Sequence, residues 1–383
     1  MRFVRVGDVC GQAREAVRPG ERPELRYIGL ESIASGSGEF VTGELSKTPE
    51  TPQANSFRFG PEHVLYGKLR PYLNKVVLPC FEGKCSTEII PLLPNGEVER
   101  AYLAYFLRSQ RVVDAVSAKT AGARMPRADM DFVFSLCFSL PPLEEQRRIV
   151  DLLSRAEGIV RLRREAEKKA AELIPALFLD MFGDPATNPK GWPIQSLKNL
   201  VSFVSGGTPS KSREDFWEGD LPWVSPKDMK RVGIDSAFDH VNRKVLTETA
   251  IKLIPVGSVL VVVRGMILVH TVPVAQSLVP MTINQDMKAL VPIQSVNGTY
   301  LLWSLRVRQG QLLSLVTTAA HGTKKMETER LEAFSISLPP LAAQEDFAGK
   351  LASIESIQSQ QSAATAKAQA TFDALLAQAL AAE

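Results

Sequence analysis

The chain of 383 residues has few cysteines and no long apolar run, the features on which disulfide scaffolds and membrane proteins depend. Its four cysteines, Cys10, Cys80, Cys85 and Cys137, are scattered through the first half, unlike the cysteine framework of a small secreted domain. The apolar run at 258–263 stops at Arg264, far short of the roughly 18 apolar residues that a membrane span needs. The N-terminus alternates like a strand and has no apolar signal core, so we expect a cytoplasmic protein with no membrane span.

Motifs for metal binding and catalysis are also missing. Cys80 and Cys85 have the spacing of a zinc knuckle but lack two further ligands nearby. The segment 60–68 has the wrong glycine spacing for a phosphate loop, and 36–38 lacks the third glycine of a dinucleotide fingerprint. No Gly-x-Ser-x-Gly elbow, His-Glu-x-x-His helix or Asn-Pro-Pro-aromatic motif of amino-methyltransferases occurs. We expect no metal, no cofactor and no catalytic residue, which favours a binding and assembly protein over an enzyme.

The sequence instead contains a long internal repeat with an offset of 198 residues. Ser139-Leu140-Pro141-Pro142-Leu143 recurs as Ser337-Leu338-Pro339-Pro340-Leu341, and 102–108 matches 300–306 with four identities in seven. Chance matches rarely share one offset over such a distance. The repeat predicts two copies of one unit, each a module of strands and helix that continues into a long helix.

Each Pro-Pro-Leu signature predicts a helix start, because proline fixes φ where no N–H is needed and acidic residues follow at the positive end of the helix. Apolar residues at heptad spacing then predict two coiled-coil helices. Pro175 should kink or end the first helix near residue 174, after about 32 residues or roughly 48 Å. The positions we expect to pair the helices or to meet partners are Ile149, Leu152, Ala156, Ile159, Arg163, Ile354, Gln361 and Ala368.

Arg163 and Gln361 fall at the same heptad position of the two predicted helices. They can form a polar layer that sets the pairing register, or each can extend into solvent. The sequence leaves both alternatives open.

Short β-type runs and one short helix recur within each module. Strands are predicted at 25–30, 64–69 and 88–92 and again at 221–224, 259–263 and 287–291, with a short amphipathic helix at 102–109. The predicted fold class is α+β, with two mixed α/β modules separated by two long antiparallel coiled-coil helices in a pseudo-twofold tandem repeat.

Positive charge is concentrated in the modules. Residues 1–142 hold 18 Lys and Arg against 16 Asp and Glu, and residues 183–340 hold 17 against 13. The helical segments 143–182 and 341–383 hold 8 against 8 and 2 against 5. This distribution is compatible with an anionic partner that the modules hold.

Several segments together resemble one known family. They are the two Pro-Pro-Leu-x-x-Gln helix starts, Ser205-Gly206-Gly207-Thr208-Pro209-Ser210-Lys211, the run 219–228, and Val64 to Leu73. In this order they resemble the DNA-specificity subunit of type I restriction-modification systems. The first module departs from the pattern, because it lacks a clear Gly-Gly-Thr-Pro segment.

The resemblance implies a division of labour along the chain. Residues 1–142 and 183–340 would be two target-recognition domains, each reading one half of an interrupted site in double-stranded DNA. The helices at 143–182 and 341–383 would pair antiparallel, hold the domains apart and dock two methyltransferase subunits, which restriction subunits then join. The subunit itself would carry no catalysis.

Within that frame, lysine and arginine would neutralise phosphates, while bidentate side chains in the major groove would read bases. We expect the run 120–127 to face DNA, the loop 210–213 to approach phosphates, and Trp223 to belong to the core. An ordinary solvated surface position is the alternative for each lysine. The predicted DNA contacts are Lys68, Arg70, Tyr72, Lys75, Arg124, Arg127, Lys211, Arg213, Lys227, Lys230, Arg264, Lys324 and Lys325.

Two rival functions remain compatible with the sequence. One is a coiled-coil scaffold whose modules bind protein. The other is an enzyme with an unrecognised site around Lys227-Asp228 or the turn 284–286.

Overall fold

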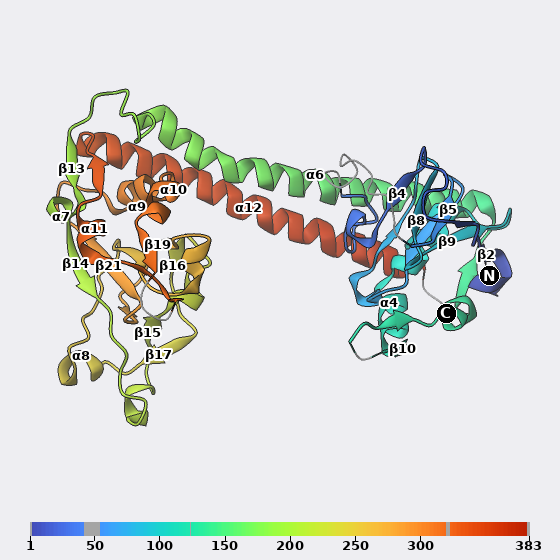
Figure 1. Cartoon of the computed structure of the whole chain (residues 1–383), viewed down its shortest axis with the longest axis horizontal. Helices are drawn as coiled ribbons and strands as arrows, with labels where there is room; N and C mark the ends of the chain where they lie inside the picture. The colour runs from blue at the N-terminus through green and yellow to red at the C-terminus, as the bar shows by residue number, and fades with distance from the viewer. Residues whose placement is uncertain (1, 42–53, 123, 319–321, 381–383) are drawn as a thin grey trace. The chain divides into compact units, whose positions relative to one another are not determined.

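The computed structural model describes residues 2–41, 54–122, 124–318 and 322–380 (Figure 1). The chain divides into two compact units. Unit 1 comprises Met1–Glu165 and Ser362–Glu383, and unit 2 comprises Ala166–Gln361. Each unit therefore contains one module, the first part of the long helix that follows this module, and the last part of the other long helix.

The two long helices are α6 (Leu143–Phe182) and α12 (Leu341–Ala379). In unit 1 the beginning of α6 packs against the end of α12, and in unit 2 the beginning of α12 packs against the end of α6. The helices are therefore antiparallel, as predicted. None of the described helices, these two included, has enough apolar length to cross a membrane.

Of the two outcomes predicted for Pro175, an end of α6 near residue 174 is wrong, and a kink stays a prediction. Proline at 175 removes one backbone donor, yet α6 continues to Phe182. The residues after the proline explain why, because Phe178 and Phe182 are buried in unit 2 and contact Tyr300 with ring centroids 5.6 and 4.9 Å apart. Burial of two aromatic side chains compensates for the lost hydrogen bond.

The predicted pairing and partner positions in α6 differ in burial. Leu152 and Ile159 are 44% and 51% exposed, whereas Leu153 and Val160, one residue later, are buried against α12. Since apolar residues occur in adjacent pairs here, the sequence period alone could not select the buried member. Arg163 is exposed and so takes no part in a buried polar layer. The remaining predicted pairing positions Ile149, Ala156, Ile354, Gln361 and Ala368 are half-buried.

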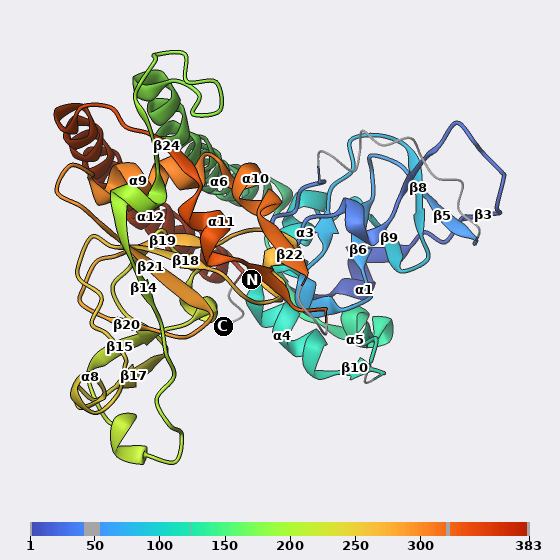
Figure 2. The same ribbon diagram turned by 60° about the vertical axis from the view of Figure 1, so that its left-hand side comes forward.

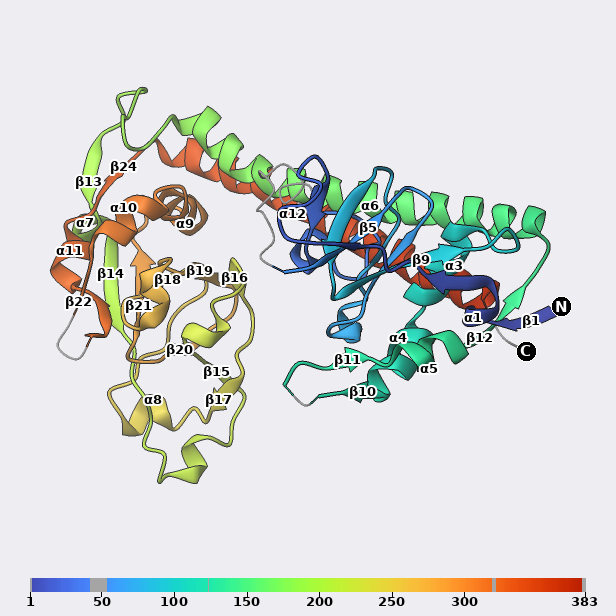
Figure 3. The same cartoon turned by 45° about the vertical axis from the view of Figure 1, so that its right-hand side comes forward.

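Unit 1 is built on two four-stranded sheets with strand orders β3-β5-β8-β4 and β2-β9-β6-β7, and Figure 3 brings it forward. Its strands are β1 (Arg2–Arg5), β2 (Cys10–Gln12), β3 (Ala16–Val17), β4 (Arg26–Ile28), β5 (Ser56–Phe59), β6 (Val64–Gly67), β7 (Val76–Val77), β8 (Gly83–Ser86), β9 (Ile89–Pro94), β10 (Thr120–Ala121), β11 (Arg127–Ala128) and β12 (Cys137–Leu140). Its shorter helices are α1 (Val6–Val9), η1 (Leu30–Ser32), η2 (Pro71–Leu73), α3 (Arg100–Arg108), α4 (Gln110–Ala118) and α5 (Met130–Ser135). The first strand, β1, pairs antiparallel with β12, the strand that leads into α6.

Unit 2 is built on a five-stranded sheet, β14-β21-β18-β19-β16, and a three-stranded sheet, β17-β15-β20 (Figure 2). Its strands are β13 (Ile194–Ser196), β14 (Val201–Ser205), β15 (Leu221–Val224), β16 (Gly233–Ile234), β17 (Asp239–Val241), β18 (Val259–Val262), β19 (Val274–Ser277), β20 (Thr282–Ile283), β21 (Met287–Pro292), β22 (Val316–Thr318), β23 (Lys324–Met326) and β24 (Ser335–Ser337). Its shorter helices are α7 (Leu197–Leu200), η3 (Glu214–Phe216), η4 (Pro226–Asp228), α8 (Val245–Glu248), η5 (Met266–Val269), α9 (Gly298–Arg306), α10 (Gln309–Ser314) and α11 (Thr328–Glu332). Here too the first strand, β13, pairs with the last, β24.

One buried glutamine joins the module to the long helix in each unit. Gln146 accepts a hydrogen bond from the backbone N–H of Glu99 (2.8 Å), and Gln344 accepts one from that of Asn297 (2.9 Å). The side-chain amide of each glutamine also donates to two backbone carbonyls. Because a buried amide must find partners, these contacts fix where the helix leaves its module.

A buried tyrosine repeats the same relation between helix and strand. The Tyr102 hydroxyl of α3 donates to the Ser139 carbonyl (2.9 Å), and the Tyr300 hydroxyl of α9 donates to the Ser337 carbonyl (2.6 Å). Burial raises the pKa of both tyrosines to about 12. The 198-residue repeat therefore holds at the level of single hydrogen bonds, and the predicted α+β fold with two paired long helices is confirmed.

Candidate nucleic-acid interface

In unit 1, the loop after β6 lies against the hairpin formed by β10 and β11. The Arg70 backbone N–H donates to the Pro126 carbonyl (2.7 Å), and the Ala128 N–H donates to the Lys68 carbonyl (2.8 Å). In Figure 3 the hairpin lies beside α4 and α5. We call this surface patch 1, and its side chains are Lys68, Arg70, Tyr72, Arg124 and Arg127.

Unit 2 has the same arrangement after β18. Arg264 forms a backbone bridge with Lys325 of the hairpin β22–β23, and the Gly265 N–H donates to the Lys324 carbonyl (3.0 Å). The Met326 N–H closes the contact by donating to the Val263 carbonyl (2.8 Å). We call this surface patch 2, and its side chains are Arg264, Met266, Lys324 and Lys325.

Acidic residues are scarce in the segments that form both patches. In unit 1, the segments 63–81 and 115–128 contain no Asp or Glu. In unit 2, the segments 263–268 and 316–326 contain Arg264, Lys324 and Lys325 and no Asp or Glu. A surface built from such segments carries a local excess of positive charge, although the net charge of the chain is only +3.

The side chains of patch 1 differ in how available their charge is. Arg127 binds the Glu88 carboxylate through two guanidinium nitrogens, and this contact raises the pKa of Arg127. Lys68 lies 3.9 Å from the same carboxylate. Arg70, Tyr72 and Arg124 are exposed, and no ion pair to either arginine is found in the described part of the chain. Ala123, beside Arg124, lies outside the described residues.

The patch 2 cations differ in the same way. Lys325 forms an ion pair with Glu327 (3.0 Å), and the Lys324 ammonium donates to the Thr318 hydroxyl (2.7 Å). Arg264 is exposed, and within the described ranges it has no carboxylate partner. It is therefore the cation of patch 2 with the most accessible charge.

The Lys75 side chain is engaged within the fold of unit 1. Its ammonium donates to the Leu30 carbonyl (2.5 Å), and partial burial lowers the pKa of this lysine. Its charge stabilises the loop that follows β4. The structure thus gives Lys75 a role in the fold.

The loop at 210–213, which the sequence favours for phosphate contact, is surrounded by carboxylates. Arg213 is held by Asp215 (2.7 Å) and Glu248 (2.9 Å). Lys211 lines a cavity of about 600 Å³ together with the acidic side chains Glu214, Glu218 and Asp239. The structure therefore gives no support to phosphate binding here.

Lys227 and Lys230 lie at and just after η4. Lys227 pairs with Asp239 (2.7 Å), and both lysines line a different cavity, of about 670 Å³, which Ile267 of η5 also lines. Trp223 is buried, in line with its expected place in the core.

The residues of the rival enzymatic sites are engaged in turn contacts. The Asp228 carboxylate accepts from the N–H groups of Ser225 (2.8 Å) and Phe238 (2.9 Å) and so caps η4. The Asn284 amide donates to Asp286 (3.2 Å). Among the described residues, no group of three or more His, Cys, Asp or Glu is placed to hold a metal.

Sequence reasoning missed the exposed apolar residues beside Arg264. Met266 and Ile267 are exposed at the start of η5. The signal was present, since an apolar pair follows Arg264-Gly265, but the pair reads from sequence as a continuation of the buried valine run. Only the turn at Gly265, with φ of 128°, directs the pair to the surface.

Comparison with known proteins gives the family. Residues 72–172 and 189–366 match the type I restriction modification DNA specificity domain. A segment of 152 residues is 34% identical to the specificity subunit of the Escherichia coli type I restriction enzyme EcoR124I/EcoR124II. That match covers 39% of this chain and only 38% of the relative.

Two solved structures share the fold. A chain from a structure of the assembly and conformational transition of the type I R-M system aligns with a TM-score of 0.67 over 99% of this chain and 97% of that chain, at 22% identity. The type I S subunit from M. genitalium aligns with a TM-score of 0.54 over 100% and 96%, at 13% identity. At these identities the likeness concerns the fold. With the family match over most of its length, the chain belongs to the type I restriction-modification specificity family, whose members are non-catalytic within the complex.

Proposed function

We propose that this chain is the DNA-specificity subunit of a type I restriction-modification complex and that it recognises one interrupted site in double-stranded DNA. Residues 1–142 and 183–340 act as the two target-recognition domains, and each contacts one half-site. The observation that carries the proposal is the recurrence of a cation-rich patch, built from the same loop and hairpin, in both modules. A single chain with two such patches can read two different half-sites.

The side chains of the two patches differ in their expected contribution to DNA binding. Arg70, Arg124 and Arg264 are the strongest candidates for contact with phosphates or base edges, because they are exposed and unpaired within the described residues. Lys68, Arg127, Lys324 and Lys325 add local positive charge. The carboxylate-bound Arg213 and Lys227 and the carboxylate-surrounded Lys211 rank last.

The long helices serve as spacer and docking surface in this proposal. Residues 143–182 and 341–383 set the separation of the recognition domains, and two methyltransferase subunits bind along them, which restriction subunits then join. Exposed apolar residues on the helices support a partner surface: Leu152, Ile159 and Leu162 in unit 1 and Leu173 and Ile357 in unit 2. A cytoplasmic location accompanies this function.

The deciding experiment maps methylated sites in DNA from cells that carry the chain with its partner subunits. We expect one bipartite sequence with a fixed spacer. Binding of the complex to that duplex should weaken steeply as salt rises, because phosphate contacts release counterions. Binding that is indifferent to sequence or to salt would contradict the proposal.

Single substitutions assign the patches to half-sites. Arg70→Ala should weaken discrimination in one half-site only and Arg264→Ala in the other only, each by roughly 1–3 kcal/mol. Arg213→Ala is the matched control, since its charge is already neutralised by two carboxylates. If Arg213→Ala weakened binding more than Arg264→Ala, patch 2 would not be the contact surface.

A further inference from the structure

Patch 2 presents two large apolar side chains to solvent directly beside Arg264. Met266 is 63% exposed and Ile267 is 43% exposed. Both belong to η5, in which Leu268 is buried and anchors the turn to the core of unit 2. Single exposed apolar residues are common on folded proteins, but two consecutive ones beside an exposed arginine indicate a contact surface.

The backbone holds this pair in a defined position. Gly265 adopts a φ of 128°, which favours glycine, and its N–H is bound to the hairpin at Lys324. On the other side, the N–H groups of His270 and Thr271 both donate to the Ile267 carbonyl (3.1 Å). The two side chains are thus carried on a turn that is fixed at both ends, as a specific contact requires.

Patch 1 contains a counterpart at the same spacing. Arg70-Pro71-Tyr72 parallels Arg264-Gly265-Met266, with an arginine, a residue that sets the turn, and an exposed large side chain. Tyr72 is 55% exposed. The arrangement therefore belongs to both modules and is not a local accident of unit 2.

Charge indicates which partner these apolar residues meet. Arg264, Lys324 and Lys325 lie at this turn and its hairpin, and of the three only Lys325 has a carboxylate partner among the described residues, so the surface attracts a polyanion. In the major groove of DNA, the C5-methyl group of thymine is the apolar feature of the base edges. Apolar side chains beside an arginine match a groove that offers such methyl groups between phosphates.

We propose that Met266 and Ile267 determine specificity by packing against thymine methyl groups in the half-site read by unit 2, and that Tyr72 does the same for unit 1. This inference rests on the proposed function. It adds residue identities and a base preference: the second half-site contains at least one A·T pair, whose thymine methyl is covered by η5.

The test uses the full chain in complex with its methyltransferase subunits and a duplex that carries the mapped site. Each thymine of the second half-site is replaced in turn by uracil, which removes only the methyl group. For the unaltered protein, we expect one or two replacements to weaken binding by roughly 3- to 10-fold, the scale for burial of one methyl group. In Met266→Ala/Ile267→Ala, binding to the thymine duplex should fall by a similar factor, and the same replacements should have no further effect.

Ile293→Ala is the matched control, because Ile293 is a similarly exposed apolar residue of unit 2 outside patch 2. It should keep the full response to uracil. In the first half-site, the effect of uracil replacement on binding should be lost in Tyr72→Ala and kept in Met266→Ala/Ile267→Ala. Since all of these side chains are exposed, between 41% and 63%, the variants should fold.

Three outcomes overturn the inference. They are a second half-site without A·T pairs, an η5 variant that retains the full uracil response, and an η5 variant that loses its methyltransferase subunits while its DNA contact is unchanged. The proposed function survives all three if Arg264→Ala still weakens binding to that half-site. A complex that shows no site-specific binding at all would instead remove the proposed function.

Discussion

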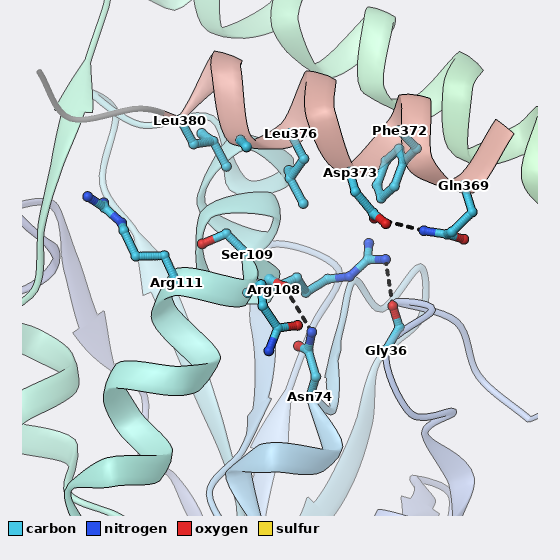
Figure 4. Close-up of a pocket in the computed structure, with 12 residues that line it drawn as sticks. Gly36, Asn74, Arg108, Ser109, Arg111, Gln369, Phe372, Asp373, Leu376 and Leu380 are labelled. Atoms are coloured by element: carbon cyan, nitrogen blue, oxygen red, sulfur yellow. Dashed lines mark hydrogen bonds between the residues drawn. The ribbon is translucent and has the colours of Figure 1, made fainter. Parts of the chain in front are cut away.

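The two units differ at two equivalent positions of their long helices. In unit 1 these positions are Leu376 and Leu380 of α12, and in unit 2 they are Phe178 and Phe182 of α6. The phenylalanines are buried against the aromatic ring of Tyr300. The leucines border a cavity of about 730 Å³, in which Arg108 and Asn74 also lie (Figure 4). The comparison shows that the repeat preserves hydrogen bonds between module and helix while side-chain volume varies.

The electrostatics of the two units differ at the same place. In unit 1, the buried Arg108 binds Glu157, which also accepts from the Tyr105 hydroxyl (3.0 Å). In unit 2, the corresponding Arg306 donates to the Val274 carbonyl (2.9 Å), and burial lowers the pKa of this arginine. Glu355, the counterpart of Glu157, has no hydrogen-bond partner in the described ranges, and burial raises its pKa. Arg108 and Glu157 thus form an ion pair in unit 1, whereas the described residues show no ion pair between their counterparts Arg306 and Glu355 in unit 2.

The largest expected effect tests where the units agree. Leu153 and Leu351 occupy the same repeat position, and each is buried in the core of its unit. Leu153→Ala and Leu351→Ala should each lower the free energy of unfolding by about 2–5 kcal/mol, through lost burial and a cavity. Urea unfolding of the full chain measures both.

Leu152→Ala is the control for this pair, because Leu152 precedes Leu153 but is 44% exposed. It should cost less than about 1 kcal/mol. A Leu152 variant as unstable as the Leu153 variant would restore the heptad register predicted from sequence.

A smaller effect tests where the units differ. Glu157→Gln should lower stability by about 1–3 kcal/mol at pH 7, because it leaves the Arg108 guanidinium without its carboxylate. Glu355→Gln should be neutral or slightly stabilising, since the ionised Glu355 is partly desolvated. Thermal unfolding of both variants gives the comparison.

The pH dependence of Glu355→Gln follows from the direction of the shift. Because its folded-state pKa is raised, Glu355 contributes most stability when protonated and loses that contribution as pH rises from the unfolded value through the folded value. The free energy of unfolding of Glu355→Gln should therefore rise relative to that of the unaltered protein as pH increases from 4 to 7. A constant difference across this range would mean that Glu355 does not titrate abnormally.

The comparison also explains what sequence could and could not predict. The repeat, the two helix starts at Pro142 and Pro340, and the paired helices follow from local signals, because proline and heptad spacing act within a few residues. The passage of α6 through Pro175 is accompanied by packing of Phe178 and Phe182 on Tyr300, far along the chain, and the choice of Leu153 and Val160 as the buried residues depends on tertiary contacts in unit 1; no local pattern contains either.

The prediction of DNA-contact residues was limited for the same reason, since local sequence does not show tertiary contacts. Arg70 and Arg264 could be chosen by residue type and position, and the structure places both on patches with a hairpin partner. Arg213 and Lys75 were chosen on the same grounds, yet one is neutralised by carboxylates and the other bonds a buried carbonyl. Basic residues are recognisable in sequence, but their partners come from tertiary contacts.

The smallest effect tests the cavity of unit 1. Leu376→Phe places a larger side chain beside the cavity seen in Figure 4. The residue at the same repeat position of unit 2 is already a phenylalanine, Phe178. Because room exists, the change in the free energy of unfolding should lie between zero and a gain of about 1 kcal/mol. Leu153→Phe adds the same atoms at a fully buried position and should cost about 1–3 kcal/mol. Equal losses from both variants would mean that the unit 1 cavity cannot accept an aromatic ring, and that the difference between the units lies in backbone spacing instead of side-chain volume.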